Sequence, residues 1–290
     1  MPISRQKIAL QFIERSGGAI GKLDLVKLMF LVSKEGTKLR DAGTFYQFLP
    51  YKRGPFSFAL YNELNALARD QHIALEDLQV SMVKPALSRF CVEPEIQREV
   101  DSVWGKYGGM TTDQKVEHVY SAYPWYTVNS EWKERRKMSL PVADVGVYTV
   151  GYEGLQIDGF LDLLLRAGIK TIIDVRANPV SRKYGFHKST LVRISGDVGI
   201  DYRHYPQVGI PAAWRTDLMT SDDYLKLFDR YEREILPGQD AVVVEIAGIM
   251  AKVPSVLVCQ EKDPSYCHRT RLARALSTRC GLSIDDLRSA

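Results

Sequence analysis

The chain has 290 residues, a length that accommodates two ordinary domains. Hydrophobic residues make up 45% of it and charged residues 26%, which is typical of a globular protein, and no run of about eighteen apolar residues predicts a membrane span. The four cysteines favour reduced thiols over a disulfide framework, and the first residues lack a signal-peptide core, so we expect a cytoplasmic protein.

The formal net charge is +4, and the first half of the chain carries it. Residues 1–140 contain 20 Lys and Arg against 16 Asp and Glu, whereas residues 141–290 contain 19 of each. A surplus this small permits a nucleic-acid-binding surface without requiring one, and an ordinary solvated surface explains it at least as well.

Helical spacing dominates the first half. Apolar residues at intervals of three and four predict helices over residues 7–15, 23–33 and 56–68. The aromatic run 45–51 predicts a short strand, which the Lys-Arg-Gly-Pro turn at 52–55 ends. Helices arranged around a short aromatic ribbon indicate a mainly helical, winged-helix-like domain.

The composition changes near residue 140. A charged segment, residues 131–140, ends before Pro141, and we place the domain boundary there, with a helical domain at 1–140 and a second domain at 141–290.

The second domain alternates between strands and helices. Near-continuous apolar strands that alternate with helices are typical of an α/β fold, a mostly parallel sheet with helices on both faces. Strands are predicted at residues 145–150, 171–175, 241–246 and 254–259, and helices at 157–167 and 222–236.

The crossing from the last predicted strand to a helix predicted at residues 270–276 concentrates reactive groups. Cys259, Glu261, Cys267, His268 and Arg269 lie within this one segment. Crossings of this kind, at the carboxyl ends of the strands, are where open α/β sheets bind their ligands.

This cluster allows three interpretations. A thiolate nucleophile is one, because His268, Arg269 and a helix N-terminus all lower a cysteine pKa. A metal site is another, since Cys259, Cys267 and His268 offer three ligands; their spacing matches no common zinc pattern, so we assign no metal and leave the cofactor unknown. In the third, the thiols are structural, while Glu261 and His268 perform acid/base chemistry beside an anion held by Arg269.

A second polar group follows the strand at 171–175. Burial of Asp174 and Arg176 at a strand end requires either a mutual ion pair or a ligand. The basic loop 177–188 comes next, and its cations interleave with aromatic rings, an arrangement that suits phosphate and base binding. Ser181, Tyr184 and Phe186 in this loop are therefore candidate substrate-binding residues.

Three further positions are candidates for the same cleft. The turn 151–154 lacks the G-x-G-x-x-G pattern, which disfavours a nicotinamide cofactor, but its Tyr152 is suited to stacking on a base. Glu245, on the predicted strand 241–246, is either buried with a partner or directed at the cleft. Trp214 and Arg215 follow a Gly-Ile-Pro turn and are candidates for a lid.

The second half resembles the DUF488 family of bacterial proteins. The resembling motifs are TVGYEG at 149–154, IDVRANPVS at 173–181, YRHYP at 202–206, and CQE at 259–261 followed by CHR at 267–269. The tract QVGIP at 207–211 departs from the family's usual Leu-Gly-Gly pattern. The family is named for its unknown function, so the resemblance implies positions rather than a reaction.

The first half looks like SocA/Panacea-type modules. The resembling motifs are LVKLMF at residues 25–30 and YKRGPFS at 51–57. Such modules accompany toxin–antitoxin and phage-related genes, so the resemblance implies a setting in phage defence or on a mobile element.

We expect a hydrolase that acts on nucleic acid or nucleotides, by base excision, phosphodiester cleavage or nucleotide hydrolysis. Asp174 and Glu261 are the expected acid/base pair, His268 assists proton transfer, and Arg176 and Arg269 hold a phosphate. A non-catalytic regulator or antitoxin-like protein that binds nucleic acid or another ligand is the alternative. Thiol redox chemistry through Cys259 and Cys267 is a third hypothesis, and it requires the two sulfur atoms to reach disulfide geometry. We expect no membrane partner, and an oligomer is compatible with the sequence.

Overall fold

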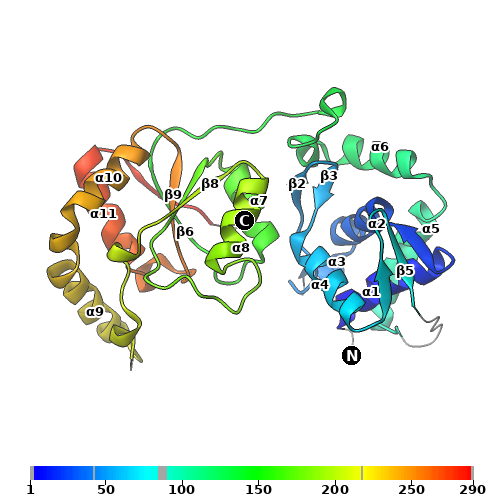
Figure 1. The fold of residues 1–290 in the computed structure, drawn as a ribbon, viewed down its shortest axis with the longest axis horizontal. Helices are drawn as coiled ribbons and strands as arrows, with labels where there is room; N and C mark the ends of the chain where they lie inside the picture. The colour runs from blue at the N-terminus through cyan, green and yellow to red at the C-terminus, as the bar shows by residue number, and fades with distance from the viewer. Residues whose placement is uncertain (1–2, 42, 84–89, 217, 289–290) are drawn as a thin grey trace. The chain divides into compact units, whose positions relative to one another are not determined.

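The computed structural model describes residues 3–41, 43–83, 90–216 and 218–288. The chain divides into two compact units, Met1–Ser139 (unit 1) and Leu140–Ala290 (unit 2) (Figure 1). None of the helices in these described stretches combines the length and the apolar character that crossing a membrane requires.

Unit 1 is mainly helical, as its spacing predicts, and it carries two small antiparallel sheets. In one of them β5 lies between β1 and β4, while β2 and β3 form a hairpin. The elements are α1 (Ser4–Arg15), β1 (Ala19–Gly21), α2 (Lys22–Glu35), α3 (Thr37–Asp41), β2 (Leu49–Tyr51), β3 (Gly54–Phe56), α4 (Phe58–Arg69), β4 (Ile73–Leu75), β5 (Gln79–Met82), α5 (Pro94–Tyr107) and α6 (Thr112–Ala122).

Helix α2 lies at the centre of unit 1, where α1, α5 and α6 pack against it. Its residues 25–32 are all buried, which is the pattern of a helix enclosed on every side. Helix α4 begins at Phe58, two residues later than the sequence predicts, because the Ser57 hydroxyl caps it by accepting a hydrogen bond from the Leu60 amide.

A buried cation ties α2 to the β2–β3 turn. The Lys27 side chain is fully buried, and its ammonium donates a hydrogen bond to the carbonyl oxygen of Arg53. Gly54 has φ +87°, and a Cβ there would lie 2.7 Å from the Tyr120 ring and 2.9 Å from Lys27 Nζ, so only glycine fits this turn. Burial lowers the pKa of Lys27 to about 7, and the charge of Asp24 offsets that only in part.

This burial predicts a stability that depends on pH. Between about pH 7 and pH 10 the unfolded chain keeps Lys27 protonated while the folded chain does not, so the free energy of unfolding rises with pH. Replacing Lys27 by Met removes this contribution, and we expect the difference in unfolding free energy between wild type and Lys27→Met to change by about 1 kcal/mol per pH unit over this window.

Urea unfolding at pH 7, 8 and 9 measures this difference. Tryptophan fluorescence reports mainly on unit 1, which contains three of the four tryptophans, Trp104, Trp125 and Trp132. The matched control is Lys106→Met, since the Lys106 side chain is 57% exposed and should leave the pH profile unchanged. If the free energy of unfolding changed with pH in the same way in wild type and in Lys27→Met, the lowered pKa of Lys27 would be contradicted.

Unit 2 is an α/β domain with a five-stranded, all-parallel sheet in the order β10-β6-β9-β7-β8. The strand neighbours of β9 are therefore β6 and β7, both far from it in the sequence. The elements are β6 (Val147–Gly151), α7 (Ile157–Arg166), β7 (Thr171–Asp174), α8 (Lys188–Asp197), β8 (Asp201–His204), α9 (Ser221–Glu234), α10 (Asp240–Met250), β9 (Ser255–Cys259), α11 (Arg269–Cys280) and β10 (Ile284–Asp286).

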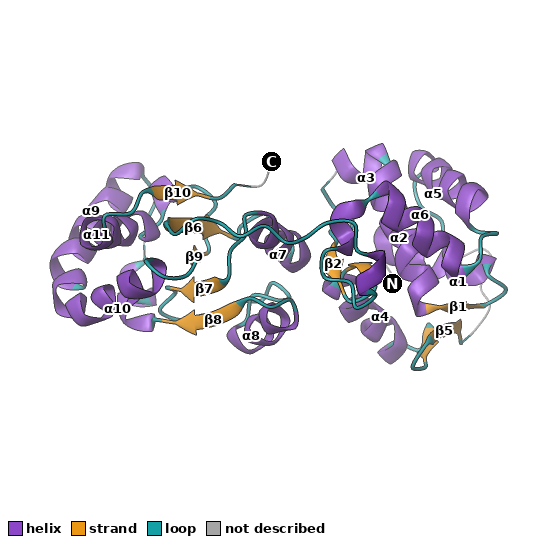
Figure 2. Cartoon of the chain, turned by 90° about the horizontal axis from the view of Figure 1, so that it is seen from above, coloured by secondary structure: helices purple, strands orange, loops and turns teal. Residues whose placement is uncertain are grey.

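Helices cover both faces of this sheet. Figure 2 shows α7 and α8 on one side and α10 and α11 on the other. Ile173 and Leu257 pack with buried residues of α10 and α11, and Cys259 belongs to the same cluster. Burial on both faces explains why the central strands are apolar throughout, as the sequence predicts.

Residues 241–246 form part of helix α10, so the strand predicted there is wrong. The run of valines favours a strand locally. However, the buried residues Val243, Ile246, Ala247 and Met250 follow helical spacing, and Val244 between them is 50% exposed. Within unit 2, α8, β8 and the edge strand β10 were also not predicted from the sequence.

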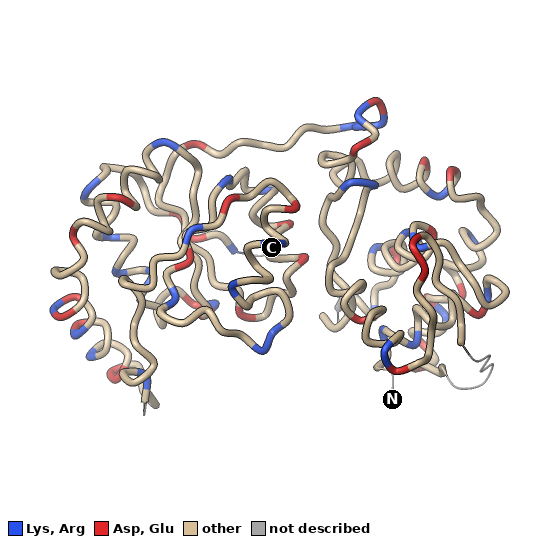
Figure 3. The backbone as a smooth tube through the Cα atoms, in the orientation of Figure 1, with Lys and Arg blue, Asp and Glu red and all other residues tan. Residues whose placement is uncertain are grey.

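The charged side chains form no segregated block along unit 1. Figure 3 shows Lys and Arg positions interspersed with Asp and Glu positions along the tube of this unit.

Candidate functional site

The loops that follow β7 and β9 meet at the carboxyl edge of the sheet. These two strands are hydrogen-bonded neighbours, with Asp174 in register with Val258. Beyond the strand ends, His268 Nε2 lies 3.2 Å from the carbonyl oxygen of Val175. Two segments more than 90 residues apart in the sequence are therefore joined at the edge where α/β sheets hold ligands.

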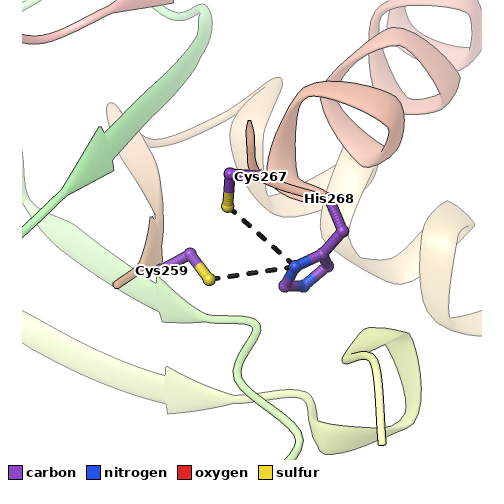
Figure 4. A group of neighbouring side chains, drawn as sticks. All are labelled: Cys259, Cys267 and His268. Carbon is purple, nitrogen blue, oxygen red and sulfur yellow. Dashed lines mark hydrogen bonds between the residues drawn. The ribbon is translucent and has the colours of Figure 1, made fainter. Parts of the chain in front are cut away.

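Two thiols and one imidazole gather at this junction (Figure 4). Cys259 is the last residue of β9, Cys267 follows a 3-10 turn, and His268 caps the N-terminus of α11. The two sulfur atoms lie 3.8 and 4.0 Å from His268 Nδ1, and all three side chains are buried. Both cysteines are free thiols.

The backbone sets the tautomer of His268. A carbonyl oxygen only accepts hydrogen bonds, so the ring must place its proton on Nε2 to bond with Val175. Nδ1 then presents a lone pair to both sulfur atoms and to Arg215 Nη2, which lies 3.4 Å away. The Tyr231 ring packs edge-on against the imidazole and limits its rotation.

Glu261 links this buried cluster to the surface. One carboxylate oxygen accepts a hydrogen bond from Arg215 at 2.6 Å, and the other lies 3.1 Å from the Cys259 sulfur. Burial alone would raise the pKa of Glu261, but the charge of Arg215 and hydrogen bonds from the two thiols lower it to about 2. The side chains of Glu261 and Arg215 remain 21% and 35% exposed, so both can reach a ligand.

The two thiols have opposite acidities. A hydrogen bond from Cys267 lowers the pKa of Cys259 against the effect of burial. Burial raises the pKa of Cys267, and the neighbouring Cys259 sulfur raises it further. The contact between Cys259 and Glu261 is a hydrogen bond only while Cys259 keeps its proton. When Cys259 ionises, Cys267 becomes the donor, so the site favours the loss of one proton and not of two.

A cavity of about 370 Å³ opens beside Glu261 and Arg215. Its other walls are apolar or aromatic, and they come from the segment 218–219, from helix α9 and from the turn before Cys267: Leu218, Met219, Tyr224, Leu227, Phe228 and Tyr266. The cavity therefore combines one ion pair with a ring-sized apolar space.

A second cavity, of about 560 Å³, lies on the other side of the 261–264 loop. It is lined by residues of the turn 151–155, by Lys262, Asp263 and Pro264, and by Leu287 and Arg288. Glu153 accepts a hydrogen bond from the Lys262 amide at 3.0 Å, so the turn predicted to hold a base instead supports this loop.

Arg269 anchors the loop between the two cavities. Its guanidinium is fully buried, donates to the carbonyl oxygens of Glu261 and Lys262, and pairs with Asp286 at 3.3 Å. These contacts favour a positioning role over the phosphate-binding role expected from the sequence.

Asp174 and Arg176 form an internal ion pair. Arg176 donates to both Asp174 carboxylate oxygens, and the Tyr202 hydroxyl donates to one of them at 2.7 Å. Asp174 is fully buried, and Arg176 also donates to the Tyr152 hydroxyl and to the carbonyl oxygen of Phe186. Of the two alternatives that the sequence leaves open, these contacts favour the mutual pair over catalysis and ligand binding.

The other predicted binding residues line neither of the two cavities. Tyr152 and Phe186 stack on each other, with ring centroids 4.1 Å apart, and both side chains are buried. The stacked faces of the two rings are therefore not available to a base. Ser181 and Tyr184 are half-buried and absent from the walls of both cavities. Glu245 lies on α10 instead of a strand and accepts a hydrogen bond from the Tyr205 hydroxyl.

Sequence reasoning did not assign a binding role to the aromatic residues of the first cavity. Tyr224 and Phe228 lie four residues apart on α9, which places both on one face of that helix. This spacing is detectable in the sequence, but it is equally typical of a core face, and only the position of Tyr266 against Tyr224 shows that they form a common wall.

The internal ion pair generates a prediction about stability. Asp174→Asn leaves the buried Arg176 charge without its partner, and we expect the free energy of unfolding of unit 2 to fall by about 3–5 kcal/mol. Amide hydrogen exchange in β7 and β9 measures the change. Asp197→Asn is the matched control because its ion pair with Arg193 is exposed, and it should cost under about 1 kcal/mol. Equal exchange rates in both variants would restore a ligand-binding role for Asp174.

Comparison with known proteins identifies one domain. Residues 156–276 match the model of DUF488, a domain of unknown function, which covers most of unit 2. The motif at 149–154 lies outside the match, and the resemblance of unit 1 to SocA/Panacea-type modules stays a prediction. No curated protein and no solved structure matches the chain. The segment from α7 to α11, which contributes Cys259, Glu261, Cys267 and His268, is thus a DUF488 domain.

Proposed function

We propose that unit 2 is a hydrolase that acts on nucleic acid or nucleotides and breaks a bond next to the base. The observation that carries the proposal is the carboxylate of Glu261, which is partly exposed, paired with Arg215, and placed at the wall of an aromatic cavity. A carboxylate that stays ionised at this wall can orient a water molecule and accept its proton as the water attacks.

The lining of the cavity favours the base over the phosphate as the bound group. Tyr224, Phe228 and Tyr266 offer rings, and a flipped-out base binds by stacking on such side chains. Arg215 is the single cation among the lining residues, whereas phosphate sites normally use several donors. Among base excision, phosphodiester cleavage and nucleotide hydrolysis, the first therefore fits best.

In base excision the reaction adds water across the bond between the sugar C1′ and the base nitrogen. Glu261 takes a proton from the water as its oxygen bonds to C1′, the C–N bond breaks, and its electron pair leaves with the base. The base then takes up a proton, which Glu261 can return. Arg215, in contact with Glu261, can stabilise negative charge on the departing base.

Unit 1 is the proposed nucleic-acid-binding part of the chain. The support is its surplus of Lys and Arg over Asp and Glu and its resemblance to modules found beside phage-related genes. A role in phage defence or on a mobile element is part of the same proposal.

The test is a product assay with a matched pair of variants. Full-length protein is incubated with single- and double-stranded DNA, RNA and free nucleotides, each with ordinary and modified bases, and the products are analysed by mass spectrometry. We expect a released base, and we expect Glu261→Gln to lower its rate of release by about 100-fold or more while the circular dichroism spectrum stays unchanged.

Glu234→Gln is the control, because Glu234 pairs with Arg230 on the surface of α9 and should keep full activity. Equal rates for wild type and Glu261→Gln would remove Glu261 from the mechanism. Binding of a substrate without any product across the whole panel would instead support the alternative, a ligand-binding regulator.

A further inference from the structure

We infer that Cys259, Cys267 and His268 form a binding site for one thiophilic divalent metal ion, with zinc as the natural occupant. The proposed hydrolysis assigns no role to these three buried side chains, and the inference does not depend on it. Their donor atoms all lie within 4.8 Å of one another, so one ion can contact all three.

The distances fit a tetrahedral ion. Zinc–sulfur bonds of about 2.3 Å and zinc–nitrogen bonds of about 2.0 Å place adjacent sulfur and nitrogen ligands about 3.6 Å apart. In this structure the two sulfurs lie 3.8 and 4.0 Å from His268 Nδ1. The two sulfur–nitrogen distances need to shorten by only a few tenths of an ångström around an ion, whereas 4.0 Å is long for a hydrogen bond between a thiol and an imidazole.

The orientation of His268 matches that of a metal ligand. Ligating histidines usually donate the second ring N–H to a carboxylate or a backbone carbonyl, which fixes the ring and its tautomer. His268 does so through Nε2 to Val175, and this leaves the Nδ1 lone pair directed toward Cys259 and Cys267 (Figure 4).

The surroundings hold these ligands in place. Cys259 ends a central strand, and Cys267 and His268 begin a helix, so all three backbones belong to regular elements or their ends.

Two thiolates, one neutral imidazole and a divalent ion also carry no net charge. A neutral group of this kind suits burial better than thiolates without a counter-ion would.

The Glu261 carboxylate lies beside this set of ligands, 3.1 Å from the Cys259 sulfur. Two sulfurs and one nitrogen favour zinc over the hard cations magnesium and calcium, which prefer oxygen ligands.

The test is metal binding by the full-length protein without any substrate. Protein stripped by a chelator is titrated with Co²⁺, which reports tetrahedral thiolate ligation by its visible spectrum and its sulfur-to-metal charge-transfer band. We expect one Co²⁺ per chain, displaced by Zn²⁺, and about one zinc per chain in untreated protein by elemental analysis. Cys259→Ser and Cys267→Ser should each weaken Co²⁺ binding at least about 10-fold and lose the charge-transfer intensity of one thiolate.

Cys280→Ser and Cys91→Ser are the matched controls. Cys280 donates a hydrogen bond to the Leu276 carbonyl within α11, and Cys91 is exposed, so both variants should bind Co²⁺ as wild type does.

Wild-type protein that gives no charge-transfer band on Co²⁺ addition overturns the inference, and this result does not require any variant to fold. A Cys259–Cys267 disulfide that forms under mild oxidation at the same rate with and without Zn²⁺ also overturns it, and supports redox chemistry. Since no product is measured, failure of the hydrolase assay leaves the metal test intact.

Discussion

The buried guanidinium of Arg269 holds the crossing from β9 to α11, and the geometry of the candidate site depends on it. Backbone carbonyls that leave a strand lose their sheet partners and need new donors. Arg269 supplies them to Glu261 and Lys262, and those two oxygens together with Asp286 compensate its burial. The loop comes so close to β6 that a Cβ on Gly151 would lie 1.8 Å from the Glu261 carbonyl oxygen. Gly151 leaves room for the loop to approach β6, and Arg269 holds the loop in that position.

The order of the strands explains why distant residues converge. β9 lies between β6 and β7, so the turn after β6 meets one side of the β9 loop and the segment after β7 meets the other. Glu153 supports the first side through the Lys262 amide, and the Val175 carbonyl orients His268 on the second. A parallel sheet brings all these loops to one edge, and the two cavities flank the loop that lies between them.

The sequence was sufficient for the α/β class, the helical character of the first half and the concentration of reactive groups at 259–269, because these depend on local periodicity and on neighbours in the chain. It was insufficient for Arg215, which pairs with Glu261 from 46 positions away and carries no local signal of that contact. The strand predicted at residues 241–246 failed because a local signal was present but was overridden. The β-branched side chains favour a strand, whereas packing against the sheet places the segment in a helix. The interpretation of Asp174 and Arg176 needed the structure, because a mutual pair and a ligand site look alike in a sequence.

Two of the carboxylate–guanidinium pairs in unit 2 differ mainly in their access to solvent. In the pair of Asp174 with Arg176, the side chains are 0% and 7% exposed, and neighbouring groups of the same domain occupy the remaining donors and acceptors. In the pair of Glu261 with Arg215, both side chains are partly exposed at a cavity wall. A fully enclosed pair cannot exchange a partner for a ligand without leaving a buried charge unpaired, which costs several kcal/mol. The partly exposed pair can make that exchange, because water and substrate reach it, and for this reason the chemistry is assigned to Glu261 and the structural role to Asp174.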